Sequence, residues 1–150
     1  MRPLALLALF LTALTALACA TAPAGPHREV LAPSPSPLPV FSPAVRTGNL
    51  VFLSGQIGNE PGTLELVPGG IAAETEQTLT NIRTLLEQIG LSLGDVVKCT
   101  VFLADIDDYR AMNEVYARFF PKDPPARSTL AASGLALGAR AEIECIAAAR

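Results

Sequence analysis

A change in hydrophobic period near the middle of the chain constrains the fold more than any other feature. Apolar residues recur at three- and four-residue steps from 71 to 89, which predicts an amphipathic helix. The period changes to two from 95 to 103, which predicts a β-strand, and apolar residues on both of its faces favour a central place in a sheet. Strict alternation puts Val97, Cys99, Val101 and Leu103 on one face and Val96, Lys98, Thr100 and Phe102 on the other. One long helix and one central strand therefore form the frame on which the rest of the chain is placed.

Turn signals predict further strands around this frame. Two β-prone runs, 41–46 and 50–54, flank a Thr-Gly-Asn turn whose tolerance of positive φ suits a tight hairpin. A long connection rich in Gly and Pro follows them. Near the C-terminus, the run 141–147 alternates apolar residues with acids and predicts a closing strand.

Three closely spaced acids invite the hypothesis of a metal site. Asp105, Asp107 and Asp108 stand together, but Asp is a preferred helix cap and a helical apolar pattern follows them as far as Pro121. We therefore expect a second helix here and no metal. The only histidine, His27, has no neighbouring cysteine or carboxylate cluster, so it is expected to be solvated.

The first 39 residues are expected to lie outside the folded domain. Residues 1–18, with one basic residue and a continuous apolar stretch, are typical of a signal peptide. Cys19 follows directly and fits a bacterial lipobox, which predicts lipidation and anchoring to the cell envelope; ordinary cleavage with an incidental cysteine is the alternative. Residues 19–39 are rich in Pro, Ala and Ser and predict an extended tether. The sequence therefore predicts a folded domain from 40 to 150 that is exported to the periplasm.

Composition narrows the classes of function. The chain has 150 residues, half of them apolar, which suffices for one domain with one core. Its formal net charge is -3 and it contains no cluster of Lys and Arg, so it lacks the electrostatic footprint of a nucleic-acid binder.

The segment from 124 to 146 carries the candidate chemistry. Arg127 begins one extended run, and Glu142 and Glu144 lie on the closing strand after a loop of small residues. We expect this hairpin-like excursion to bring guanidinium and carboxylate toward each other. An arginine fork can grip a substrate carboxylate, and a carboxylate can hold a water molecule. Isolated Arg/Glu pairs are nevertheless more often surface charges or structural salt bridges.

Several motifs in order resemble the RidA/YjgF family. They are LVFLSGQIG, TLTNIRTLLEQIGLSLGDVVKCTVFLADIDDYRAMNEVYARFF, PPARST and AEIECIA, and they span nearly all of the chain from 41 onward. The resemblance implies an α+β, chorismate-mutase-like fold with a mixed sheet, two helices on one face and a homotrimeric assembly. Its ligand sites would lie in clefts between neighbouring chains. It also implies hydrolytic deamination of small 2-imino or enamine acids to 2-oxo acids and ammonia, without a metal or organic cofactor.

The resemblance assigns roles to individual residues. Arg127 matches the family arginine that grips the substrate carboxylate, and Glu142 matches the acid that activates water. Five further positions match substrate-binding positions of the family: Phe41, Ser54, Gly55, Asn113 and Thr129. Phe41 and Thr129 depart from the best-known members, which have Tyr in place of Phe41 and Cys in place of Thr129. This departure leaves the preferred substrate open.

Two other functions remain as alternatives. Reactive imines arise mainly in the cytoplasm, so an exported member of the family could instead bind a small carboxylate, or a partner, without turnover. Endoribonuclease activity ranks third, because the chain is acidic and its single histidine lies in the expected tether.

Cys99 and Cys145 leave two states open. Outside the cytoplasm they could oxidise together. Both lie in the middle of apolar strands, however, where a cysteine is more commonly a small buried hydrophobic residue, and we expect that second state.

Overall fold

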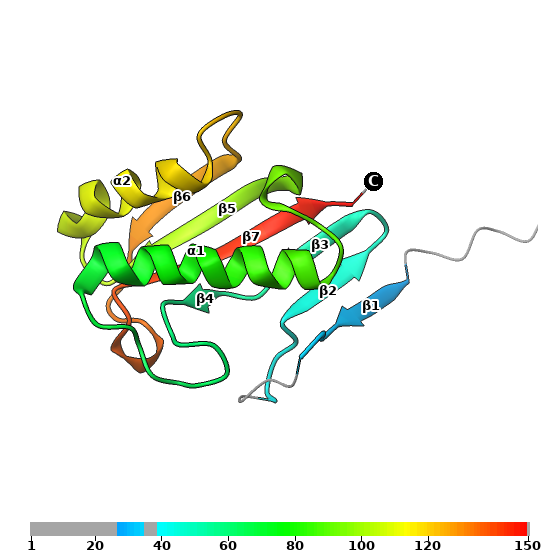
Figure 1. Ribbon diagram of the computed structural model, residues 1–150, viewed down its shortest axis with the longest axis horizontal. Coiled ribbons are helices and arrows are strands. Elements are labelled where there is room, and N and C mark those ends of the chain that lie inside the picture. Colours follow the sequence, from blue (N-terminus) through cyan, green and yellow to red (C-terminus); the bar gives the residue numbers. More distant parts are fainter. Residues whose placement is uncertain (1–26, 35–38, 150) are drawn as a thin grey trace, which may run out of the picture.

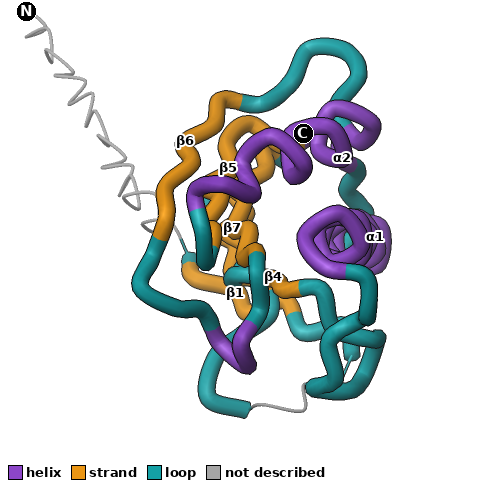
Figure 2. Tube along the Cα trace, turned by 90° about the vertical axis from the view of Figure 1, so that its left-hand side faces the viewer, coloured by secondary structure: helices purple, strands orange, loops and turns teal. Residues whose placement is uncertain are grey.

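One mixed sheet carries both helices on a single face in the computed structural model, which describes residues 27–34 and 39–149 (Figures 1 and 2). The strands are β1 (Arg28–Leu31), β2 (Ala44–Thr47), β3 (Leu50–Leu53), β4 (Gln56–Ile57), β5 (Val96–Leu103), β6 (Ala126–Ala131) and β7 (Ala141–Ala148). The helices are α1 (Gly70–Gln88) and α2 (Tyr109–Phe119), with short 3-10 turns η1 (Leu93–Asp95), η2 (Ile106–Asp108) and η3 (Ala136–Gly138). The predicted α+β architecture is confirmed.

The order of the strands places β5 between the two segments of greatest chemical interest. The sheet runs β1-β2-β3-β7-β5-β6, and β4 pairs with β7 beside this path. β5 pairs with β7 in the antiparallel sense and with β6 in the parallel sense. β6 and β7 are therefore separated by a whole strand, and the segment between them is no hairpin.

The core lies between the sheet and α1. Leu79, Ile82 and Leu86 of α1 are fully buried, so the predicted apolar stripe of this helix is confirmed. Val101 of β5 and Ile143 of β7 are also fully buried on the helix side of the sheet. The two central strands and α1 thus form the hydrophobic centre of the domain.

The expected strict alternation of β5 is wrong at its start. Val96 is 7% exposed and Val97 is 47% exposed, the reverse of the prediction. The cause is an irregularity in the β5–β7 pairing between Val96 and Lys98, which reverses the faces of the sheet on which Val96 and Val97 lie. From Cys99 onward the strand alternates as predicted.

The expected domain boundary at residue 40 is also wrong. β1 lies inside the presumed tether and pairs with β2 from Arg28↔Thr47 to Leu31↔Ala44, so the sheet already begins at Arg28. A short edge strand needs only a free neighbouring edge, and its residues are mostly exposed, which is why hydrophobic patterning missed it. The predicted signal peptide and Cys19 lie outside the described residues. Within 27–34 and 39–149, no helix has the length and apolar character needed to cross a membrane.

The turn and cap predictions hold. Gly48 adopts a φ of 58° between β2 and β3, where the hairpin was expected. The Asp105 carboxylate accepts a hydrogen bond from the Asp107 backbone N–H at 2.9 Å and so caps η2, which leads into α2.

In the described part of the chain, no group of three or more His, Cys, Asp or Glu residues is arranged to hold a metal ion.

Cys99 and Cys145 form a disulfide, which corrects the expectation of two buried thiols. They are direct partners in the β5–β7 pair, with Cα atoms 4.1 Å apart, and both are buried. The sequence indicated burial but could not show the register that places the two residues opposite each other. The cross-link joins the two central strands beneath the helices.

Removal of the cross-link should lower stability. The disulfide closes a loop of 46 residues, and the chain-entropy account then predicts a loss of about 2–4 kcal/mol in the free energy of unfolding. Denaturant unfolding with and without reductant should show this loss in the wild type. The Cys99→Ala/Cys145→Ala double variant should not respond to reductant. A wild-type curve that is unchanged by reductant would contradict the cross-link.

Candidate functional site

Glu142 borders a cavity at the end of the sheet. The cavity has a volume of about 580 Å³ and is also bordered by Phe41, Ser54 and Gly55. Three of the five predicted substrate-binding residues therefore lie around the predicted acid. Further apolar residues of the wall are Pro43, Ile57, Pro61, Leu64, Leu85, Ala136 and Leu137, and its remaining polar residues are Gln56, Asn59, Thr80, Asn81, Thr84 and Gln88. We call this group the acid half-site.

Backbone contacts fix the acid half-site. The Ser54 hydroxyl donates a hydrogen bond to the Ser42 carbonyl at 2.7 Å, which ties the end of β3 to the segment that carries Phe41. An added Cβ at Gly55 would collide with Oε1 of Glu142 and would displace the carboxylate from its position. The glycine thus allows the carboxylate to lie directly against the backbone.

The Glu142 carboxylate is partly buried and open to a ligand. Burial raises its pKa, and the charge of Glu144, two residues along the same strand, raises that pKa further. Among the described residues, no side chain donates a hydrogen bond to this carboxylate. A water molecule could therefore take that place.

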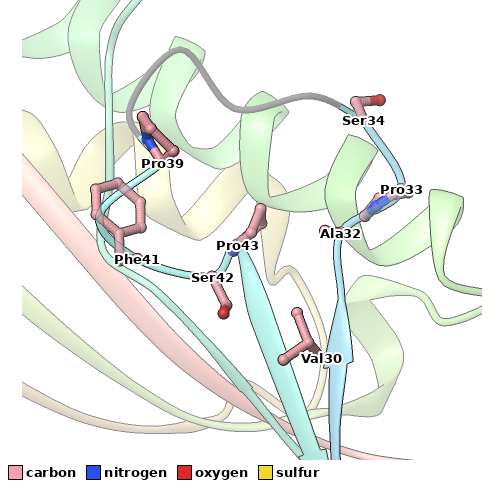
Figure 3. Close-up of a pocket in the computed structure, with 8 residues that line it drawn as sticks. All are labelled: Val30, Ala32, Pro33, Ser34, Pro39, Phe41, Ser42 and Pro43. Carbon is pink, nitrogen blue, oxygen red and sulfur yellow. The ribbon is translucent and has the colours of Figure 1, made fainter.

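A second cavity, of about 440 Å³, lies between β1 and the segment before β2 (Figure 3). Phe41 and Pro43 border both cavities. The described lining of this second cavity is otherwise small and mostly apolar, with only Ser34 and Ser42 as polar side chains. It carries no candidate acid, base or charge among those residues, whereas the predicted catalytic residues are Glu142 of the acid half-site and Arg127.

Arg127 lies on β6 under α2, where it contacts two tyrosines. Its guanidinium carbon is 4.6 Å from the ring centroid of Tyr116 and 5.9 Å from that of Tyr109. Its Nη2 donates a hydrogen bond to the Tyr109 hydroxyl at 3.4 Å. These contacts hold the planar group by cation–π attraction while leaving it half-buried.

The other two predicted substrate-binding residues accompany Arg127. Asn113 lies one turn along α2 from Tyr109, and its side chain lowers the pKa of the Tyr109 phenol. Thr129 lies two residues along β6 on the same face as Arg127, and its buried hydroxyl has no hydrogen-bond partner within the described chain. We call Arg127, Tyr109, Asn113 and Thr129 the cationic half-site.

One chain does not bring the two half-sites together. Arg127 pairs with Cys99 of β5, whereas Glu142 pairs with Phe102, three residues further along the same strand. Successive side chains of a strand alternate between its faces, so Arg127 lies on the helix side and Glu142 on the opposite side. The expected convergence within one excursion is therefore wrong, and its cause is the insertion of β5 between β6 and β7.

A group of ionic contacts around two buried carboxylates was missed from the sequence. The Arg140 guanidinium donates two hydrogen bonds to the Asp108 carboxylate, at 2.8 and 2.9 Å, and the Arg140 backbone N–H donates to Glu74 at 2.7 Å. Asp108 raises the pKa of Arg140 above its usual range. One signal was available: Glu74 lies eight residues before Ile82, on the buried stripe of α1. The group ties α1 and η2 to the loop that leads into β7 and Glu142.

A mixed sheet with two helices on one face and a half-buried acid beside an open cavity defines the structural class. Residues 32–149 match the family model described as Endoribonuclease L-PSP. A RutC family protein of Pyrococcus horikoshii is 45% identical over 114 residues, which cover 76% of this chain and 90% of that protein. A goat (Capra hircus) protein named 2-iminobutanoate/2-iminopropanoate deaminase is 42% identical over 116 residues, covering 77% and 85%.

Solved structures agree with these relatives. The crystal structure of the YjgF gene product from E. coli superposes with a TM-score of 0.74 at 35% identity, covering 81% of this chain and 99% of that one. The chain therefore belongs to the RidA/YjgF family, as its motifs predicted.

Titration of Glu142 should be visible in the stability of the protein. Because its pKa is raised in the folded state, the folded protein binds more protons than the unfolded chain between the ordinary and the raised value. The free energy of unfolding should therefore fall as pH rises through that window, and Glu142→Gln should remove this fall. Unfolding curves across the acidic pH range test it, and parallel pH profiles of the two proteins would contradict it. Glu144→Gln should remove part of the fall, since one of the two causes of the shift is lost.

Proposed function

We propose that this protein is a homotrimeric hydrolase that converts small 2-imino acids into 2-oxo acids and ammonia. In this proposal each site is a cleft in which the cationic half-site of one chain faces the acid half-site of its neighbour. The observation that carries it is the division of the predicted residues into two groups on opposite faces of one sheet. Such a division is useless within one chain but is suited to a ring of identical chains, where each chain gives one half to each neighbour.

The uncovered face of the sheet supports the assembly. Both helices lie on the other face (Figure 2), while large apolar side chains remain exposed here. Val30, Leu50, Phe52 and Leu130 are each between 37% and 45% exposed. A large apolar sheet face that faces water is costly, and a second copy of the chain would bury it.

The proposed chemistry needs few groups. Arg127 binds the substrate carboxylate through two parallel hydrogen bonds and so fixes the position of the imine carbon. Glu142 accepts a proton from a water molecule, whose oxygen forms a bond to that carbon. The electron pair of the C=N double bond moves to the nitrogen, which takes the proton back from the acid and leaves a carbinolamine. The ionised Glu142 then accepts the hydroxyl proton of this carbinolamine and passes it to the nitrogen, the C=O bond forms as the carbon–nitrogen bond breaks, and ammonia and the 2-oxo acid leave. A raised pKa suits an acid that must both accept and donate a proton near neutral pH.

The wall of the acid half-site supports apolar substrates. Phe41, Leu64 and Leu137 border the cavity and are each about half exposed. They offer contact to a short aliphatic side chain. Relatives named 2-iminobutanoate/2-iminopropanoate deaminase agree with such a substrate.

Export remains part of the proposal. The disulfide between Cys99 and Cys145 supports it, because disulfides persist mainly in oxidising compartments such as the periplasm. Lipidation of Cys19 would then anchor the trimer to the cell envelope. Metabolic labelling with a radioactive fatty acid, compared between the wild type and Cys19→Ala, tests the anchor.

A coupled assay separates the three functions. An amino-acid oxidase generates the imine, a chemical trap reports how much survives, and the protein should speed its loss. Saturable binding of a 2-oxo acid without faster imine loss would favour the non-catalytic binder. The family model is described as an endoribonuclease, so RNA cleavage without metal that disappears in Arg127→Ala would favour that activity.

Single substitutions should separate binding from turnover. Arg127→Ala removes two charged hydrogen bonds and should lower kcat/KM by about 100-fold or more. Glu142→Gln should lower kcat by about 10²–10⁴ and leave KM nearly unchanged, since only the proton transfer is lost. Arg110→Ala and Glu114→Gln, which change an exposed ion pair on α2, serve as controls and should keep wild-type kinetics. Wild-type turnover in either site variant would remove that residue from its role.

Mixed trimers should regain activity. If each site takes Arg127 from one chain and Glu142 from the next, random assembly of equal amounts of the two inactive variants gives about one quarter intact sites. We expect roughly that fraction of wild-type activity after the variants are unfolded together and refolded. Each variant refolded alone is the control and should stay inactive. Activity that remains absent in the mixture, with trimers formed, would place both residues in sites of a single chain.

A further inference from the structure

Tyr109, the first residue of α2, places a hydroxyl at the edge of the cationic half-site. Tyr109 is 42% exposed, and its hydroxyl oxygen accepts a hydrogen bond from Nη2 of Arg127 at 3.4 Å. Asn113, one turn further along α2, is close enough to lower the pKa of this phenol. A large aromatic residue that is half exposed and bonded to the key arginine has a polar group available to a ligand.

The two neighbours leave the phenol proton of Tyr109 available. The Asn113 hydrogen bond and then the Arg127 charge and hydrogen bond lower the pKa of the phenol, which is the effect of groups that donate to its oxygen. Because the Tyr109 oxygen accepts from the Arg127 guanidinium, which has no acceptor, the phenol O–H is directed toward another group. That hydroxyl lies beside the guanidinium on which a substrate carboxylate would rest.

We propose that Tyr109 is a second carboxylate-binding group, which donates its O–H to the substrate carboxylate held by Arg127. The inference rests on the proposed function and deepens it, because it extends the carboxylate site from one side chain to two. A carboxylate has about four lone-pair positions, and the arginine fork uses one on each oxygen. The tyrosine hydroxyl uses another and selects for a planar carboxylate at this position.

Tyr116 contacts Arg127 but is not part of the cationic half-site, so it provides a matched comparison. Its ring lies closer to the guanidinium, at 4.6 Å, but it is only 5% exposed. Its hydroxyl is buried without a hydrogen-bond partner in the described chain, and burial raises its pKa to about 12. The two tyrosines thus share the contact with Arg127, and only Tyr109 offers a hydroxyl to a ligand.

The test compares Tyr109→Phe with Tyr116→Phe. Both variants keep the aromatic ring and its contact with Arg127, and each loses one hydroxyl. Calorimetric titration with 2-oxobutanoate should show a Kd about 10-fold higher in Tyr109→Phe, the loss expected for a hydrogen bond to a charged group, and an unchanged Kd in Tyr116→Phe. In steady-state kinetics, KM should rise in Tyr109→Phe while kcat stays within about 2-fold, because the bond is made equally before and during the reaction.

The outcomes distinguish this inference from the proposed function. Wild-type Kd and KM in Tyr109→Phe would overturn the role of Tyr109 alone. A fall in kcat with an unchanged KM would also overturn it, since it would place the hydroxyl in the chemical step. A wild-type protein that binds 2-oxobutanoate but does not hydrolyse imines would overturn the proposed function, and the Kd values of the two variants would still decide on Tyr109. A wild-type protein that neither binds nor hydrolyses would overturn both.

Discussion

The pairing of β5 with both β6 and β7 is the constraint on which the rest of the molecule depends. β5 meets β7 antiparallel and β6 parallel, and the Cys99–Cys145 disulfide fastens the antiparallel pair. Because the side chains of a strand alternate, this pairing sends Arg127 to the helix face and Glu142 to the open face. The same sheet thus separates the two charges within one chain, as the proposed cleft between neighbouring chains requires.

The acid half-site depends on a second interaction at some distance from it. Asp108 and Glu74 are 8% and 5% exposed, and Arg140 satisfies both, one through its guanidinium and the other through its backbone N–H. An unpaired buried carboxylate would be strongly destabilising, so these bonds oblige α1, η2 and the loop before β7 to stay together. Since Glu142 follows Arg140 by two residues, the contacts of Arg140 with Asp108 and Glu74 also fix the position of Glu142.

The parts of the fold that could be predicted from sequence are those with local signals. The stripe of α1, the turn at Gly48 and the cap at Asp105 each depend on residues within a few positions, and each is confirmed. The pairing of β1, the irregularity at Val96 and the disulfide depend on which strands are neighbours in the sheet. The sequence carries no local signal for this order. The candidate residues came from motif resemblance, while their division between two faces required the order of the strands. Tyr109 had no signal of its own, because a tyrosine at a helix start is ordinary until an arginine is found against it.

In the proposed cleft the two half-sites also regulate each other's charge. Within one chain, burial and Glu144 raise the pKa of Glu142. An unoccupied Arg127 from the neighbour would oppose this, since a nearby cation favours the ionised carboxylate. The free site would therefore hold Glu142 ready to accept a proton. A bound substrate carboxylate would neutralise the charge of Arg127, so that this charge no longer lowers the pKa of Glu142. The pKa would then rise at the step in which Glu142 takes a proton from water and keeps it for the leaving nitrogen. Binding would thus raise the proton affinity of the base at the step that uses it, so the two charges serve the reaction better across a ligand than in direct contact.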